Sequence, residues 1–255
     1  MAYVDDCFGE VIRTLEETGL AEDTIVFVVA DHGEMLGERG LWYKMTFFEG
    51  AVRIPFIVHN PKRFAPHRVK ESVSLVDLLP TFTDLAGGGA RLRQPVAPLD
   101  GHSLVPHLKG NAGPDEACGE YLAEGAIEPI VMIRRGPWKY IHSLTEAPQL
   151  YHLQQDPHER QNLAAQPAYQ AQAQAFAEEV AARWNLADLD KQVRASQQKR
   201  LFLTEIAGRD AIPKWDFQPH QPASQRYIRN HQTLDEQEAF SRYPRPHQHT
   251  PGKPL

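Results

Sequence analysis

Cysteine is scarce in this sequence, and long runs of apolar residues are absent. Only two cysteines, Cys7 and Cys118, occur among 255 residues, so we expect no disulfide framework and a reducing compartment, the cytoplasm. No apolar stretch approaches the ~20 residues that a membrane-spanning helix needs. The first residues also lack the pattern of a signal peptide. We therefore predict a cytoplasmic protein with no membrane partner.

An excess of positive charge is missing as well. Lys and Arg total 27 against 33 Asp and Glu, which gives a formal net charge of -6. Proteins that bind nucleic acids usually present a basic face, so this balance argues against a nucleic-acid partner. What the chain does have is 42% hydrophobic residues. At this length that is enough to bury a substantial core, in one large domain or two smaller ones.

The chain begins with a helix followed by a strand. Apolar side chains recur at helical spacing from Val4 to Leu15, and Gly19 follows where a left-handed C-cap belongs. Residues 24–30, TIVFVVA, are apolar without alternation. Such a run indicates a strand covered on both faces, as in a parallel sheet flanked by helices.

A second strand and a second helix follow. Residues 53–61, RIPFIVHNP, indicate another buried strand, and residues 74–89 indicate a helix that three glycines end. Pro80 is tolerated near the start of that helix or kinks it. The alternation of helix and strand over residues 1–110 predicts an α/β fold with a mostly parallel sheet.

The pattern changes over residues 111–198. Short strand-like runs at 119–125, 129–143 and 149–153 are separated by turn residues, which predicts a small antiparallel sheet. Residues 168–186 are rich in alanine, with large apolar side chains every four positions, and predict a helix.

The last part of the chain is polar and rich in proline. Residues 199–246 keep several aromatic side chains within this polar background, which suggests an extended arm that docks on another surface. Residues 247–255 are expected to be disordered. We find no internal repeat.

An acid, an imidazole and a glycine end the first strand abruptly, as Asp31, His32 and Gly33. Ligands of open parallel sheets gather beyond the carboxyl ends of the strands. A turning backbone can aim a carboxylate and an imidazole at one divalent ion, although a hard ion such as Ca²⁺ normally favours oxygen donors. Alternatively, Asp31 caps a following helix and His32 is a surface residue.

Lys44 follows this turn after two further glycines, Gly37 and Gly40. A lysine that returns to the neighbourhood of a metal can neutralise a tetrahedral anion such as sulfate or phosphate. The alternative is an exposed loop lysine, which is the usual fate of this residue type.

Residues 28–58, VVADHGEMLGERGLWYKMTFFEGAVRIPFIV, resemble the metal-binding stretch of the sulfatase family, within the alkaline-phosphatase-like superfamily. The similarity continues in order and spacing through VSLVDLLPTFTDLAG, LDGHSLVPHL, IRRGPWKYI and QLYHLQQDPHERQNLA. The run from SQQKRLFL to FSRYPR resembles a C-terminal extension of the choline-sulfatase branch, which most sulfatases lack. The resemblance implies that residues 1–110 form the C-terminal part of the sulfatase sandwich, with 111–198 as a subdomain and 199–246 as that extension.

The resemblance also implies roles for particular residues. Asp31 and His32 correspond to ligands of a divalent metal, which is Ca²⁺ or else Mn²⁺ or Mg²⁺, and Lys44 to the lysine that contacts the sulfate and its bridging oxygen. Glu124 corresponds to a carboxylate in the pocket for a quaternary ammonium, which cannot donate hydrogen bonds and needs carboxylates and aromatic faces. Asp216 corresponds to an acidic contact from a neighbouring subunit's tail, which implies a homo-oligomer. Alternatively, Glu124 is an exposed acid and Asp216 a turn residue.

The nucleophile that the resemblance requires is missing. Sulfatases of this type oxidise a cysteine in a C-x-P-S-R context to formylglycine, and neither Cys7 nor Cys118 has that context. Cys7 lies on the apolar face of the first helix, where a small buried side chain is expected. Asp5 and Asp6 belong to the same helix and do not replace the family's paired N-terminal aspartates. The chain is therefore expected to be the C-terminal portion of a longer enzyme, with formylglycine in the missing N-terminal segment.

Three functions stay open. The first is hydrolysis of choline sulfate to choline and sulfate. The second keeps the fold but acts on a phosphonate, phosphate or aryl-sulfate ester, since these relatives share the metal motif. The third is a catalytically inactive chain that is competent only for subunit association through its tail.

Overall fold

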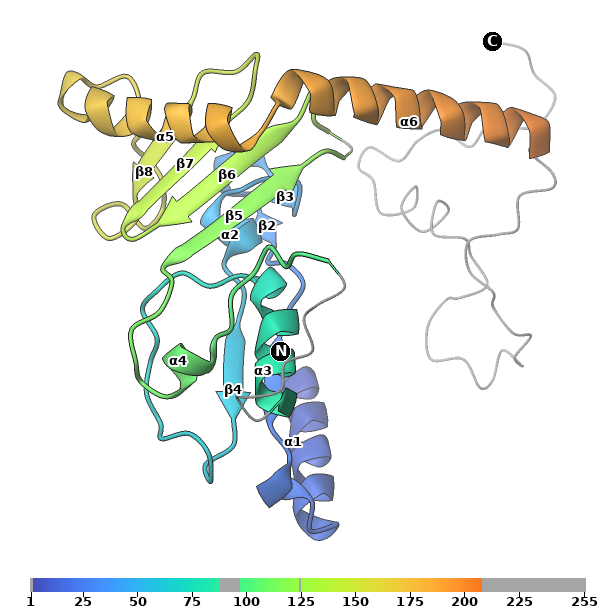
Figure 1. The fold of residues 1–255 in the computed structure, drawn as a ribbon, viewed down its shortest axis with the longest axis vertical. Coiled ribbons are helices and arrows are strands. Elements are labelled where there is room, and N and C mark those ends of the chain that lie inside the picture. The colour runs from blue at the N-terminus through green and yellow to red at the C-terminus, as the bar shows by residue number, and fades with distance from the viewer. Residues whose placement is uncertain (1, 88–96, 124, 208–255) are drawn as a thin grey trace. The chain divides into compact units, whose positions relative to one another are not determined.

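The computed structural model describes residues 2–87, 97–123 and 125–207 (Figure 1). These residues mix helices and strands in an α/β fold, and the chain divides into two compact units, Met1–Lys199 and Arg200–Leu255. The predicted extension and tail fall mostly outside the described residues. The helices are α1 (Ala2–Glu17), η1 (Ala21–Asp23), η2 (Glu38–Gly40), α2 (Glu49–Val52), η3 (Leu75–Asp77), α3 (Leu78–Gly87), α4 (Val105–Leu108), η4 (Pro167–Tyr169), α5 (Gln170–Arg183) and α6 (Leu186–Ala207). The strands are β1 (Val26–Val29), β2 (Met35–Leu36), β3 (Trp42–Tyr43), β4 (Phe56–His59), β5 (Glu116–Tyr121), β6 (Ile130–Arg135), β7 (Trp138–His142) and β8 (Gln149–His152).

Helix α1 forms where the apolar periodicity predicts it. Gly19 has a φ of 72° and its N–H donates to Glu16 O at 3.0 Å, so the expected left-handed cap is present. The apolar stripe of α1, however, is largely exposed in this structure, with Val4 at 47% and Val11 at 58%. Cys7 is exposed too, so the expectation that it is buried is wrong, because no described element packs over that stripe.

Strands β1 and β4 pair with each other, but they run antiparallel, with Phe27 opposite Val58. The mostly parallel sheet expected for residues 1–110 is therefore not seen in this pair. The reason lies in the connection between them, which consists of the β2–β3 hairpin and the single turn of α2 instead of a crossover helix. An unbroken apolar run indicates burial on both faces, and it does not define the direction of the neighbouring strand.

The predicted helix over residues 74–89 is confirmed as η3 and α3, with Pro80 in its first turns. A capping box starts it, since the Ser74 side chain accepts from the N–H of Asp77 and the Asp77 carboxylate accepts from the N–H of Ser74. Asp77 is buried and also accepts from the N–H of His102 at 2.8 Å. This carboxylate therefore ties α3 to the segment that leads into α4.

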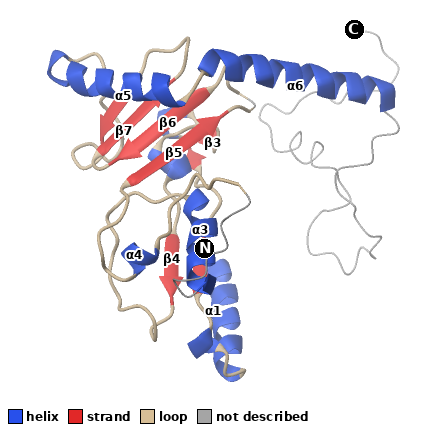
Figure 2. Cartoon of the chain, viewed as in Figure 1, coloured by secondary structure: helices blue, strands red, loops and turns tan. Residues whose placement is uncertain are grey.

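The predicted antiparallel sheet is confirmed as a meander in the order β5-β6-β7-β8 (Figure 1). Figure 2 shows β5, β6 and β7 of this sheet side by side. Its side chains alternate between two faces, as a pleated strand requires. On one face, Val131, Tyr140 and Leu150 pack with Phe176 and Val180 of α5 in a buried cluster. Helix α5 is the helix that the alanine-rich segment predicts.

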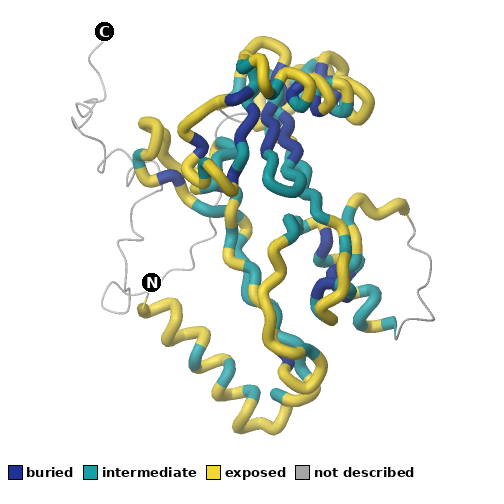
Figure 3. The backbone as a smooth tube through the Cα atoms, turned by 90° about the vertical axis from the view of Figure 1, so that its left-hand side faces the viewer, coloured by how far each residue is buried: buried dark blue, intermediate teal, exposed yellow. Residues whose placement is uncertain are grey.

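The opposite face of the same sheet meets the segment between β3 and α2. Met132, Ile141 and Tyr151 form a second buried cluster there, and Phe47 and Phe48 pack against it. Figure 3 shows the buried stretches of backbone gathered in the sheet and α5, whereas α1 is largely exposed. The best-packed part of the first unit therefore supports the loop that carries the candidate site.

Helix α6 was not expected from the sequence, which becomes polar along its length. Its 22 residues include the start of the predicted polar extension. Among the described helices, none has both the length and the apolar character needed to cross a membrane.

Candidate functional site

Asp31 and His32 lie in the turn that follows β1. Their side chains converge, with His32 Nε2 at 3.4 Å from Asp31 Oδ2, and the Asp31 side chain is 83% exposed. The other carboxylate oxygen, Oδ1, accepts from the His32 N–H at 3.0 Å. The next element is strand β2 and not a helix, so Asp31 is not the helix cap considered as the alternative.

A backbone contact fixes the ring of His32. Its Nδ1 lies 2.7 Å from the carbonyl oxygen of Gly33, and a carbonyl oxygen only accepts hydrogen bonds. In a neutral imidazole this contact assigns the proton to Nδ1 and leaves the lone pair of Nε2 free. Metal-binding histidines are commonly oriented by such a bond on the other ring nitrogen. Nε2 therefore faces Asp31 in the form that a metal ion requires.

Gly33 is held against α2 so closely that no side chain fits. Its N–H donates to Ala51 O at 2.6 Å, and the next N–H, of Glu34, donates to Gly50 O at 2.7 Å. A Cβ on Gly33 would lie 2.2 Å from Gly50 O, and a Cβ on Gly50 would lie 2.7 Å from Met35 Sδ. Glycine at both positions lets the two backbones meet, so α2 seats the turn that carries Asp31 and His32.

The β2–β3 hairpin returns the chain to this turn. Met35 pairs with Tyr43, so the strand that precedes Lys44 ends beside Met35, two residues after Gly33. Left-handed backbone at Gly37 and Gly40, with φ of 110° and 72°, allows the hairpin loop.

Lys44 is exposed at the end of that hairpin. Tyr43, just before it, has a φ of 70°, a conformation that costs a non-glycine residue about 1–3 kcal/mol and often marks a functional segment. The Lys44 carbonyl accepts from the N–H of Thr46 at 2.8 Å. No ion pair involves its ammonium among the described residues, which leaves that charge available to an anion.

Asp31 and His32 fit part of a divalent-ion site. They supply one carboxylate and one imidazole lone pair, whereas Ca²⁺ takes about 6–8 oxygen ligands. Within residues 2–87, 97–123 and 125–207, no group of three or more His, Cys, Asp or Glu side chains is arranged to hold a metal ion. An ion held here therefore needs further ligands beyond this pair.

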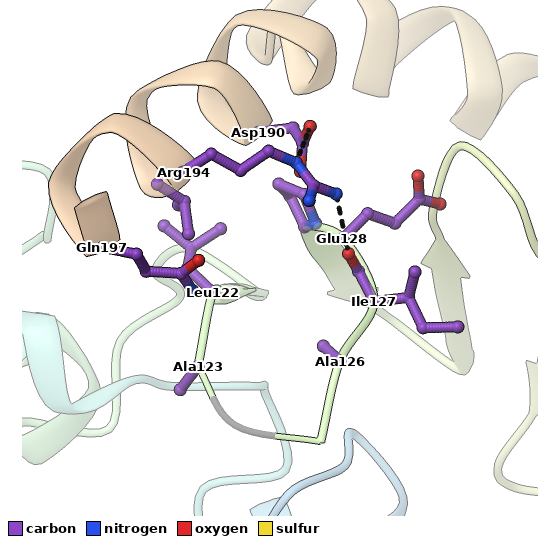
Figure 4. Close-up of a pocket in the computed structure, with 10 residues that line it drawn as sticks. Leu122, Ala123, Ala126, Ile127, Glu128, Asp190, Arg194 and Gln197 are labelled. Atoms are coloured by element: carbon purple, nitrogen blue, oxygen red, sulfur yellow. Dashed lines mark hydrogen bonds and ion pairs between the residues drawn. The ribbon is translucent and has the colours of Figure 1, made fainter. Parts of the chain in front are cut away.

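The two predicted contacts for a cationic group, Glu124 and Asp216, lie outside the described residues. Residues that flank position 124 line a hollow of about 220 Å³ beside α6 (Figure 4). Arg194 on its wall donates to Asp190 at 2.7 Å and to the Ile127 carbonyl at 3.3 Å. The lining consists of Leu122, Ala123, Ala126, Ile127, Glu128, Pro129, Asp190, Val193, Arg194 and Gln197.

The two cysteines are expected to differ strongly in reactivity. Burial, with the neighbouring Glu116, raises the pKa of the Cys118 thiol to about 11, so it is almost entirely protonated at pH 8. Only the thiolate reacts, and raising the pKa of a thiol by about two lowers the fraction present as thiolate about 100-fold. Iodoacetamide at pH 8, followed by mass spectrometry, should label exposed Cys7 quickly and Cys118 at least about 100-fold more slowly. Equal rates would contradict this description of Cys118.

Sequence reasoning missed a buried group that touches the site segment. Lys139 is fully buried in β7, with Nζ at 2.6 Å from Glu49 Oε1 and 2.8 Å from Glu159 Oε1. The signal was present in GPWKYI, where a lysine interrupts an otherwise apolar strand. A lysine at such a position must find a carboxylate or stay unpaired at high cost.

Two family models match this chain. Residues 1–88 match the model described as Sulfatase, and residues 191–243 match the model described as Choline sulfatase enzyme C terminal. The first range contains the turn with Asp31 and His32, and Lys44.

Known sequences agree with both matches. The chain is 42% identical over 248 residues to the choline-sulfatase of Rhizobium meliloti (strain 1021), which covers 96% of this chain and 48% of that relative. Arylsulfatase K of Danio rerio is 35% identical over 178 residues, which covers 65% of this chain and 32% of that relative. The chain thus spans about half the length of the first of these relatives and a third of the second.

Solved structures show the same similarity. The phosphonate monoester hydrolase of Agrobacterium radiobacter aligns with a TM-score of 0.61 at 29% identity, over 75% of this chain and 40% of that chain. A putative sulfatase from Bacteroides thetaiotaomicron aligns with a TM-score of 0.60 at 29% identity, over 71% of this chain and 40% of that chain. Together with these similarities, the two family models identify residues 1–88 as a sulfatase-family domain and residues 191–243 as a choline-sulfatase-type C-terminal domain.

Proposed function

We propose that this chain is the C-terminal part of a sulfuric ester hydrolase that converts choline sulfate and water to choline and sulfate. The observation that carries the proposal is the combination of two features in one chain. Asp31 and His32 converge in the turn after β1, in the segment that matches the sulfatase model and also contains Lys44, and the C-terminal residues match a domain of the choline-sulfatase type. The nucleophile, a formylglycine, would come from a segment other than these 255 residues.

In this proposal Asp31 and the His32 Nε2 contribute two ligands to a divalent ion, with Ca²⁺ preferred. The ion, when bound, would neutralise charge on the sulfate and lower the pKa of the attacking hydroxyl. The Gly33 carbonyl keeps the His32 proton on Nδ1, so Nε2 stays available as a ligand. The ammonium of Lys44 stabilises negative charge that develops on the bridging oxygen as the ester bond breaks.

The choline end is proposed to be recognised by Glu124, with Asp216 reaching it from the tail of a neighbouring subunit. The observation that supports this assignment is the hollow itself, which is lined by residues on both sides of position 124, among them Leu122 and Ile127. A carboxylate at position 124 would supply the negative charge that attracts a quaternary ammonium. This arrangement requires a homo-oligomer. We propose further that the complete domain has a mostly parallel sheet and that the enzyme is cytoplasmic.

The substrate is tested in a chimera in which residues 1–255 replace the matching half of the Rhizobium meliloti relative. We expect kcat/KM for choline sulfate to exceed that for 4-nitrophenyl sulfate, since the aryl ester lacks the cationic group. Glu124→Gln should lower kcat/KM for choline sulfate about 10–100-fold, which is the loss of about 1–3 kcal/mol expected for one charged contact. The same variant should leave the aryl ester almost unchanged.

Glu128→Gln is the matched control, because Glu128 also lines the hollow but its carboxylate accepts the N–H of Thr145. Equal or better turnover of the aryl ester, with no effect of Glu124→Gln, would rule out the choline assignment.

Hydrolysis of a phosphonate ester is the second candidate. The similarity to the phosphonate monoester hydrolase of Agrobacterium radiobacter favours it, because the turn and hairpin do not by themselves separate sulfate from phosphonate esters. Assaying the chimera with phenyl phosphonate monoester beside choline sulfate distinguishes the two. Faster turnover of the phosphonate would support this second candidate.

A further inference from the structure

The buried lysine of β7 lies at the centre of an ion cluster that the proposed chemistry does not use. Lys139 Nζ contacts Glu49 Oε1 at 2.6 Å and Glu159 Oε1 at 2.8 Å, and it donates to the Phe47 carbonyl at 2.9 Å. Lys139 is 0% exposed and Glu159 is 2% exposed. All three donors of the ammonium therefore have acceptors within the protein.

The partners of Lys139 either lie in the segment from Lys44 to the end of α2 or bind to it. Phe47 follows Lys44 by three residues, and Glu49 begins α2, whose carbonyls at Gly50 and Ala51 accept the N–H groups of Glu34 and Gly33. The second carboxylate oxygen of Glu159 accepts from the backbone N–H of Glu49 at 2.7 Å. The cluster therefore binds α2 through the Glu49 side chain and through the Glu49 backbone N–H.

The charges of the cluster are nearly balanced. Burial lowers the pKa of Arg134, which lies on the same face of the sheet, while Glu49 and Glu159 draw it upward. Two cations therefore share the field of one buried carboxylate, that of Glu159, and one partly exposed carboxylate, that of Glu49. Buried ion pairs of this kind add little stability over apolar packing, but they restrict the geometry of the segments that they join.

We propose that Lys139 is a positioning residue for the candidate site. By fixing Phe47 and α2 on the four-stranded sheet, it sets the place of Lys44 on one side and of the Asp31–His32 turn on the other. This inference rests on the proposed function only where activity is measured. The position of α2 can be tested without any substrate.

The first measurement is amide hydrogen exchange at Gly33 and Glu34 in the 255-residue chain. Lys139→Met should speed exchange at these two amides by about tenfold or more, because the α2 carbonyls that protect them lose their anchor. Arg135→Met is the matched control. Arg135 is likewise held by two carboxylates, Glu116 and Glu179, but it joins the sheet to α5. Arg135→Met should leave the exchange rates of the Gly33 and Glu34 amides unchanged, even where it lowers Tm as much as Lys139→Met does.

The second measurement is steady-state kinetics in the chimera. Lys139→Met should lower kcat for choline sulfate by about 10–100-fold, since misplacing a reacting group by about 1 Å has effects of this size. KM should stay within about threefold, because binding at the choline end is unaffected. Where Lys139→Met does not fold, Glu159→Gln, which keeps the shape and the acceptor for Glu49, should show the same pattern at smaller size.

The two measurements separate the two proposals. Faster exchange at Gly33 and Glu34 in a chimera that hydrolyses no choline sulfate would keep the positioning role and reject the proposed substrate. An active chimera in which Lys139→Met and Arg135→Met behave alike, in exchange and in kcat, would overturn the positioning role.

Discussion

Gly33→Ala is expected to abolish the candidate site while leaving most of the fold intact. The new Cβ would lie 2.2 Å from Gly50 O and 3.2 Å from Ala51 O, so the turn must move away from α2. We expect a loss of about 3 kcal/mol in the free energy of unfolding, the upper range for overpacking. Because His32 is held through the Gly33 carbonyl, kcat/KM of the chimera for choline sulfate should fall at least about 1,000-fold, as when a metal ligand is displaced.

Gly9→Ala is the control for that substitution. A Cβ at Gly9 in α1 would meet only the end of the Arg13 side chain, at 3.6 Å. Alanine should stabilise this helix by about 0.5–1 kcal/mol relative to glycine. Thermal unfolding and kinetics of both variants check the prediction. A Gly33→Ala protein with unchanged Tm and activity would show that the turn is not seated on α2 as described.

Lys44→Ala should have the second largest effect, and this effect should fall on activity alone. Lys44 is exposed and makes no ion pair among the described residues, so Tm should shift by less than about 1 °C. Loss of one cation from the site of developing charge typically lowers kcat about 100- to 1,000-fold. Lys44→Arg should recover only part of that rate, since a planar guanidinium replaces a compact ammonium.

Lys62→Ala provides the comparison for Lys44. Lys62 is also an exposed lysine, and its ammonium pairs with Glu22 at 3.2 Å. Its removal should change neither kcat nor Tm measurably, because exposed ion pairs contribute little. If Lys44→Ala also left kcat of the chimera unchanged, the proposed contact between this lysine and the sulfate would be rejected.

Part of the local structure followed from the sequence. The cap at Gly19 depends on neighbouring residues alone, and α1 and α3 form as predicted, whereas the capping box at Ser74 and helix α6 were not predicted. Contacts between distant segments could not be predicted from the sequence. The direction of β1 relative to β4 depends on the intervening chain, and the exposure of Cys7 depends on what packs over α1.

In the candidate site too, contacts between neighbouring residues could be predicted and contacts between distant segments could not. The pairing of Asp31 with His32 could be predicted, because the two residues are adjacent and a glycine turns the backbone after them. The approach of Lys44 rests on a resemblance and on glycines and stays a prediction, and the structure adds the pairing of Met35 with Tyr43, the residue before Lys44. The support from Lys139 could not be predicted, since it joins residues 49, 139 and 159, which are far apart in the sequence.

The most direct test of the proposed function is the rate of choline sulfate hydrolysis by the chimera, expressed per formylglycine-containing, metal-loaded site. Residues 1–255 replace a half to which they are 42% identical, so their candidate site should support the chemistry of the parent enzyme. We predict a rate within about tenfold of that parent, a difference of about 1.4 kcal/mol in activation free energy. A folded chimera with its metal and formylglycine in place, but with no hydrolysis of choline sulfate above background, would contradict the proposal.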